Sequence, residues 1–174
     1  SFFTFGSGVV PHPAIVFEDN AFYGDGNLLL RQTSAGGTPA TILTLPSEQT
    51  ILALGIDPGT GKMLISTVNR PLIVSTIPTI NKLLWYDGFS NKPLKSIIVD
   101  EAITAFRSVG TILYICYGRN LGYLSGSGIQ FLRKLLNVTY AQQDLPYKYN
   151  LTNIGNTLYV VDGSQILAHG EVPP

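Results

Sequence analysis

The chain has 174 residues and no net charge, because 11 Lys and Arg balance 11 Asp and Glu. Charged residues are 13% of the chain, about half of the roughly 25% that is typical of globular domains. This balance excludes a disordered tail, which combines low hydrophobicity with high net charge, and a nucleic-acid binder, which carries a basic surplus. The single cysteine, Cys116, excludes an internal disulfide. No apolar run is long enough to insert into a membrane as a helix.

Short apolar segments, separated by glycine and proline, recur along the whole chain and are rich in Ile, Val, Leu, Tyr and Thr. Such a pattern is typical of many short strands. In chain order it predicts strands over Ala14–Glu18, Leu28–Thr33, Ala40–Leu45, Ile51–Ile56, Lys62–Val68, Leu72–Ile77, Lys82–Tyr86, Leu94–Val99, Ile103–Arg107, Thr111–Tyr117, Leu121–Ser125, Gln130–Val138, Tyr149–Asn153, Thr157–Val161 and Gln165–His169.

Two stretches also show the 3.6-residue spacing of a helix, Leu94–Val109 and Ile129–Leu136. The first contains β-branched runs, which are stiff on a helix, and this favours strands. Helices in both places would change the fold class from all-β to α+β.

The turns between these segments have recognisable chemistry. Pro58 and Gly59 follow Asp57 between two apolar runs, which predicts a type II turn with a positive φ at Gly59. Asp162-Gly163 separates two further apolar runs and predicts a β-hairpin.

Four segments share one layout, in which three apolar strands are joined by polar turns. Aligned on their second strands at Tyr23, Leu64, Tyr114 and Tyr159, they repeat at intervals of 41, 50 and 45 residues. Propeller blades repeat at about 40–50 residues, with four antiparallel strands in each. The sequence therefore predicts an all-β fold that is a β-propeller or part of one, with about four blades, in a single domain over residues 1–174. We expect the chain to be a segment of a longer one.

Three segments carry a family resemblance: Pro11–Asp25, Leu54–Thr67 and Asn156–Asp162. They resemble the blades of YWTD propellers in proteins of the low-density-lipoprotein-receptor type, and propellers of the NHL type are similar at a comparable level. No segment has the complete Tyr-Trp-Thr-Asp motif, and the only tryptophan, Trp85, lies outside the aligned strands. The resemblance implies an extracellular ligand-binding ring, usually of six blades with flanking cysteine-rich modules, which are missing here.

Candidate binding residues are the aromatic side chains around the Asp87-Gly88 turn, namely Trp85, Tyr86 and Phe89. Rigid aromatic side chains beside a loop can anchor a protein or a sugar, whereas the alternative for Trp85 is packing between blades. The triplets that begin at Asn137 and Asn150 are sequons for N-glycosylation.

The sequence contains no constellation typical of catalysis. Residues 56–63 lack the first Gly and the final hydroxyl of a phosphate-binding loop. The spacing of Asp19, Asp25 and Asn27 is not that of a calcium loop, and His12 and His169 belong to no metal-binding or nucleophilic pattern. We therefore predict no catalytic residue, no metal site and no cofactor.

These observations predict a non-catalytic, extracellular or cell-surface binding module, a receptor-like glycoprotein whose propeller scaffold contacts a protein partner or the remaining blades of its assembly. One alternative is a structural subunit of a larger assembly, such as a virion or a surface fibre. Another is a metal-dependent propeller hydrolase, whose site would have to gather acidic side chains such as Asp25, Asp87, Glu101 and Asp162.

Overall fold

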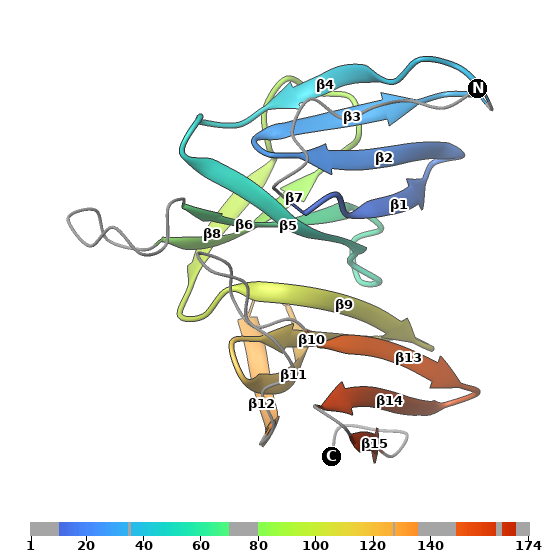
Figure 1. Ribbon diagram of the computed structural model, residues 1–174, viewed down its shortest axis with the longest axis vertical. Helices are drawn as coiled ribbons and strands as arrows, with labels where there is room; N and C mark the ends of the chain where they lie inside the picture. Colours follow the sequence, from blue (N-terminus) through green and yellow to red (C-terminus); the bar gives the residue numbers. More distant parts are fainter. Residues whose placement is uncertain are drawn as a thin grey trace.

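The computed structural model describes residues 11–34, 36–69, 80–126, 128–135, 149–162 and 165–169. These residues form 15 strands and no helix (Figure 1), so the predicted all-β class is confirmed. The strands are β1 (Ala14–Phe17), β2 (Asn20–Asp25), β3 (Leu28–Gln32), β4 (Ala40–Thr44), β5 (Gln49–Ile56), β6 (Met63–Asn69), β7 (Asn81–Tyr86), β8 (Lys95–Val99), β9 (Ile103–Val109), β10 (Ile112–Tyr117), β11 (Asn120–Ser125), β12 (Gly128–Lys134), β13 (Asn150–Ile154), β14 (Thr157–Asp162) and β15 (Gln165–His169).

The strands form four separate antiparallel sheets, each of which follows the order of the chain. Three sheets have four strands, β1–β4, β5–β8 and β9–β12, and the sheet β13–β15 has three. Every strand pairs only within its own sheet, and the described strands do not close into a ring (Figure 1). No helix in the described part of the chain is long and apolar enough to cross a membrane.

Successive sheets pack through three layers of buried apolar side chains. Phe22, Leu43, Ile65 and Tyr86 belong to the layer between β1–β4 and β5–β8. The next layer, between β5–β8 and β9–β12, contains Leu64, Leu83, Leu113 and Ile115, and the last contains Tyr114, Cys116, Leu158 and Val160. The two middle sheets are thus covered on both faces, which explains why their strands are almost continuously apolar.

The four aligned residues of the repeat all lie on the second strand of a sheet, but Tyr23 lies on the face opposite to that of the other three. Leu64 and Tyr114 point toward the sheet that follows in the chain. In the first sheet Phe22 holds that position, so Tyr23 points to the opposite side. A slip of one residue reverses the face in a strand, and the alignment on Tyr23 was wrong by that amount.

The sheets also share β-bulges, which hydrophobic patterning does not reveal. Ile42 in β4 and Leu132 in β12 are extra residues opposite the third strand of their sheets. Leu52 in β5 and Thr104 in β9 are extra residues opposite the second strand. A bulge bends a strand and increases its twist, so β5 and β9 share one local distortion and β4 and β12 share another.

Several local predictions need correction. The stretches with helical spacing are strands β8, β9 and β12. The structure confirms a second strand at Tyr23, on which the repeat is aligned, as β2, although the predicted list of strands omits it because Asn20, Gly24 and Asp25 are poor strand formers. The loop after β5 is not a type II turn, since Gly61 rather than Gly59 has the positive φ, 71°. Pairing of Asp162 with Gln165 confirms the last hairpin. The strand predicted at 72–77 lies outside the described residues.

Candidate functional site: a pocket between the first strands

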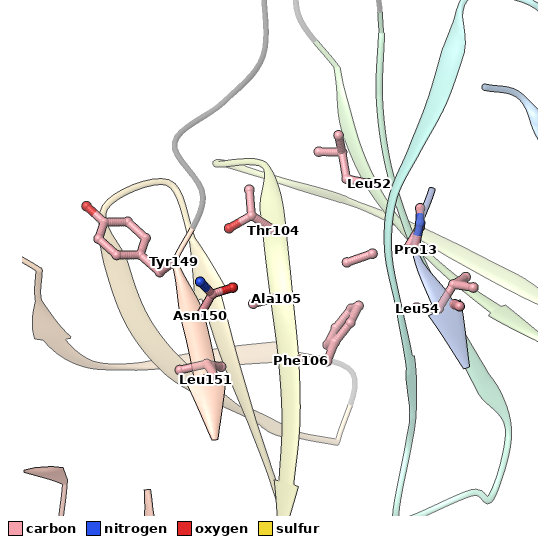
Figure 2. Close-up of a pocket in the computed structure, with 11 residues that line it drawn as sticks. Pro13, Leu52, Leu54, Thr104, Ala105, Phe106, Tyr149, Asn150 and Leu151 are labelled. Carbon is pink, nitrogen blue, oxygen red and sulfur yellow. The ribbon is translucent and has the colours of Figure 1, made fainter. Parts of the chain in front are cut away.

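The first strand of each sheet contributes to one central pocket of about 230 Å³ (Figure 2). In space β1 packs on β5, β5 on β9, and β9 on β13, and each of these strands is an edge of its own sheet. One row of backbone N–H and C=O groups on an edge strand lies outside the ladder. The pocket therefore has polar backbone in its wall. Its lining residues are Pro13, Ala14, Leu52, Ala53, Leu54, Thr104, Ala105, Phe106, Tyr149, Asn150 and Leu151.

The bulges in the first strands β5 and β9 both lie in the wall of the pocket. Leu52 is the extra residue of β5 and Thr104 that of β9. Thr104 is 6% exposed, and its hydroxyl oxygen has no hydrogen-bond partner. Bulges are common beside functional sites, where they redirect side chains. Here they place a buried hydroxyl and a leucine side chain against the pocket.

A close contact between strands positions the only phenylalanine in the lining. A Cβ atom on Gly55 of β5 would lie 2.7 Å from Cγ of Phe106 on β9. Glycine at this position therefore lets the Phe106 ring lie against β5 at the edge of the pocket (Figure 2). The sequence contains no local signal for this contact, because the two residues are 51 positions apart.

None of the lining residues carries an ionisable acid or base other than the tyrosine phenol. In the described chain two titratable residues directly adjoin lining residues, His12 before Pro13 and Arg107 after Phe106. His12 Nδ1 lies 3.1 Å from the Gly24 carbonyl oxygen and 3.8 Å from Asp25 Oδ1.

The acidic residues considered for a hydrolase do not meet in this pocket. Asp87 Oδ1 accepts hydrogen bonds from the backbone N–H of Phe89 and of Ser90, and Glu101 lies beside Gly118. Neither lines the pocket, nor does Asp25, and only the backbone of Asp162 is described. Within the described ranges, no group of three or more His, Cys, Asp or Glu could hold a metal ion.

The three aromatic candidates have different surroundings. Trp85 is 4% exposed and packs between the second and third sheets, and Tyr86 is fully buried in the first layer. The Tyr86 hydroxyl donates to the Ser90 carbonyl at 2.6 Å, and burial raises the pKa of Tyr86 to about 12. Phe89 is exposed. Of the predicted aromatic anchors, Phe89 alone presents its ring to solvent, and its role in binding stays a prediction.

The two sequons differ in what the structure describes. Asn150 begins β13, is exposed, and lines the pocket, so a glycan on it would stand at the pocket. Asn137 lies outside the described residues.

His169 is a pH-sensitive contact between the last two sheets. Its ring lies edge-on to Tyr114, with ring centroids 5.7 Å apart. Its Nε2 is buried and has no hydrogen-bond partner. Burial, together with the charge of Arg133, lowers the pKa of His169 from its usual 6.5. Protonation in the folded state is therefore disfavoured.

We expect the free energy of unfolding to fall as the pH drops below about 6.5, because the unfolded chain takes up a proton at His169 before the folded chain does. The contribution is complete above the unfolded pKa and is lost as the pH falls through the folded pKa. Urea unfolding at about pH 7 and pH 5.5 should show this slope. His169→Gln should flatten it, and His12→Gln should retain it. An unchanged slope in His169→Gln would contradict the assignment.

Comparison with known proteins adds one likeness of fold. No protein-family model matches the chain, and no curated protein sequence matches it. The solved structures include a match described as "putative exo-beta-1,3-galactanase from Bifidobacterium bifidum s17", with a TM-score of 0.52 and 11% sequence identity. The match covers 88% of this chain and 61% of that chain. At this identity the likeness concerns the fold alone, and the chain spans less than two thirds of the length of that structure.

Proposed function

We propose that the chain is part of a β-propeller and acts as a non-catalytic binding module that docks a further sheet onto β13–β15. The observation that carries this proposal is an apolar surface at the end of the stack of sheets that no other sheet of the described chain covers. We call it the terminal face and define it by the outward side chains Ile154, Tyr159, Val161, Ile166 and Ala168.

The terminal face is apolar over most of its area, although register places Asn150, Thr152 and Thr157 on the same side of the sheet. Ile154 is 72% exposed and Ile166 is 71% exposed, whereas Leu158 and Val160 on the other face of the same sheet are buried against β9–β12. Register places Val161 beside Ile166 and Tyr159 beside Ala168. In each of the two middle sheets, the face equivalent to the terminal face is covered by the sheet that follows in the sequence. The occupant that fits the terminal face is therefore another antiparallel sheet with an apolar face.

Two further observations support this occupant. Sheet stacking already occurs three times in the chain through layers of the same kind, so a fourth contact would continue an established interface. The solved bifidobacterial structure extends well beyond the part that this chain matches. In a longer chain, additional residues can provide the sheet that covers such a face. Here a protein partner with an apolar-faced sheet would provide it instead.

The terminal face can be tested on the isolated chain, where a second copy is the available apolar partner. We expect concentration-dependent association in size-exclusion chromatography with light scattering. Ile154→Asp and Ile166→Asp should abolish it. Ile98→Asp, at a residue that is 73% exposed on β8, should leave it unchanged. A monomer at every concentration, or equal loss with Ile98→Asp, would overturn the proposed docking face.

A second candidate function, carbohydrate hydrolysis, is favoured only by the description of the matched solved structure. Glycoside hydrolysis ordinarily uses a pair of carboxylic acids on either side of the scissile bond, and the described pocket wall contains none. Release of reducing sugar from a β-1,3-galactan would favour this candidate over the binding module. The extracellular location in our proposal is supported by the sequon at Asn137.

A further inference from the structure

We infer that the central pocket binds a small, uncharged molecule with several hydroxyl groups, of the size of one sugar or cyclitol ring. This goes beyond the proposed docking function, because the pocket lies between the first strands and meets the terminal face only at Asn150, which register places beside Val161. Its volume of about 230 Å³ is below the roughly 300–1,000 Å³ of pockets for drug-sized ligands. At about 30 Å³ for each water molecule, this volume is on the scale of a single ring.

The wall offers hydrogen bonds from more than one direction. The edge strands β5, β9 and β13 contribute backbone groups that lie outside their ladders. Asn150 adds a side-chain amide, which is both a donor and an acceptor, and it is exposed on β13. Figure 2 shows the Asn150 amide on one side of β9 and the Phe106 ring on the other. A ligand with hydroxyl groups around an apolar ring matches this mixture of polar and apolar walls.

The absence of charge from the described wall determines the class of ligand. The eleven lining residues include no Asp, Glu, Lys, Arg or His. Moving a charged group from water into such a site removes its hydration and supplies no counter-charge, which costs far more than burying a hydroxyl that finds a partner. The pocket should therefore select neutral polyols against acids and amines of the same size.

The test compares ring compounds that differ only in charge. We expect saturable binding of myo-inositol and D-glucose in titrations followed by protein NMR chemical shifts, with changes at β9 and β13. D-Glucuronate and D-glucosamine should bind at least about tenfold more weakly, since tenfold corresponds to only about 1.4 kcal/mol. No saturable binding of either neutral probe, or equal binding of the charged ones, would overturn the inference.

Substitutions at Asn150 locate the site. Asn150→Ala should weaken binding of the neutral probes by about three- to tenfold, the effect of one hydrogen bond. Asn150→Asp should make D-glucosamine bind more tightly than D-glucuronate, whereas both bind weakly to the wild-type protein. Asn91→Ala and Asn91→Asp, at an exposed asparagine between β7 and β8, should change neither result. An effect of equal size at Asn91 would contradict the location.

Discussion

Replacing Gly122 by alanine should destabilise the protein by about 3 kcal/mol or more, at the upper end of what overpacking costs. Gly122 lies on β11 beside the bulge in β12. A Cβ atom there would lie 2.4 Å from the Gln130 carbonyl oxygen and 2.8 Å from Cε1 of Tyr117. The first of these atoms is backbone in the paired strand, so it cannot move away as a side chain can. The β11–β12 ladder would have to separate.

The matched control lies in the same hairpin. Gly128 begins β12, and a Cβ atom there would lie 3.9 Å from its nearest neighbours. Gly128→Ala should leave stability unchanged or raise it slightly, because alanine restricts the unfolded chain more than glycine does. Urea unfolding followed by circular dichroism measures both. Equal stability of Gly122→Ala and the wild-type chain would show that the strands separate more easily than the structure indicates.

Much of the fold could be predicted because its signals are local. The apolar run at Ile112–Tyr117 and the Asp-Gly signal at 162–163 each identify a strand or a hairpin without reference to the rest of the chain. The repeat could also be predicted, because each sheet has the same order of strands and packs in the same way, so that the apolar pattern recurs along the sequence. The face of each strand is harder to predict. Tyr23 and Phe22 are adjacent aromatic residues, and only packing against β5–β8 shows which one points inward.

The pocket could not be predicted in the same way. Its walls come from four strands that are far apart in the sequence, and its most distinctive residues are ordinary ones, such as Thr104 and Asn150. Bulges at Leu52 and Thr104 depend on pairing register, which hydrophobic alternation does not specify. The aromatic cluster shows that residue type alone does not distinguish a buried side chain from an exposed one. Residue type left Trp85 either as a binding anchor or as a packing residue, and the second is correct: its indole packs between sheets and donates its N–H to a buried carboxylate.

That carboxylate, Asp57, organises the end of β5. Its Oδ2 accepts hydrogen bonds from Trp85 Nε1 and from Thr60 Oγ1, each at 2.9 Å, and its Oδ1 accepts one from Gly59 N–H at 2.9 Å. Burial by itself favours the neutral acid, but these hydrogen bonds outweigh it and hold the pKa of Asp57 below its usual 3.8. The Lys95 ammonium lies 4.4 Å from the centroid of the Trp85 ring. One network therefore joins the loop after β5 to β7 and β8.

Trp85→Phe should lower the free energy of unfolding by about 1.5–3 kcal/mol, the range for a hydrogen bond to a charged group. The variant should also unfold at a higher pH than the wild-type protein when acid is added. Ionised Asp57 stabilises the fold above its unfolded pKa, and this contribution is lost as the pH falls through the folded pKa. Without the indole N–H the folded pKa rises toward the unfolded value, so this contribution becomes smaller and the less stable variant unfolds at a higher pH. Circular dichroism is the appropriate probe, because the variant has no tryptophan.

Lys95→Gln is the control for this last prediction, since it removes the cation over the ring and keeps the hydrogen bond. It should cost at most about 1 kcal/mol, the value for a cation–π contact near the surface, and it should leave the acid transition where it is in the wild-type protein. In Asp57→Asn, further loss of the indole by Trp85→Phe should cost less than in the wild-type background, because the charge is already absent. Additive losses would mean that Trp85 stabilises the fold by packing alone and that Asp57 is held by its own loop.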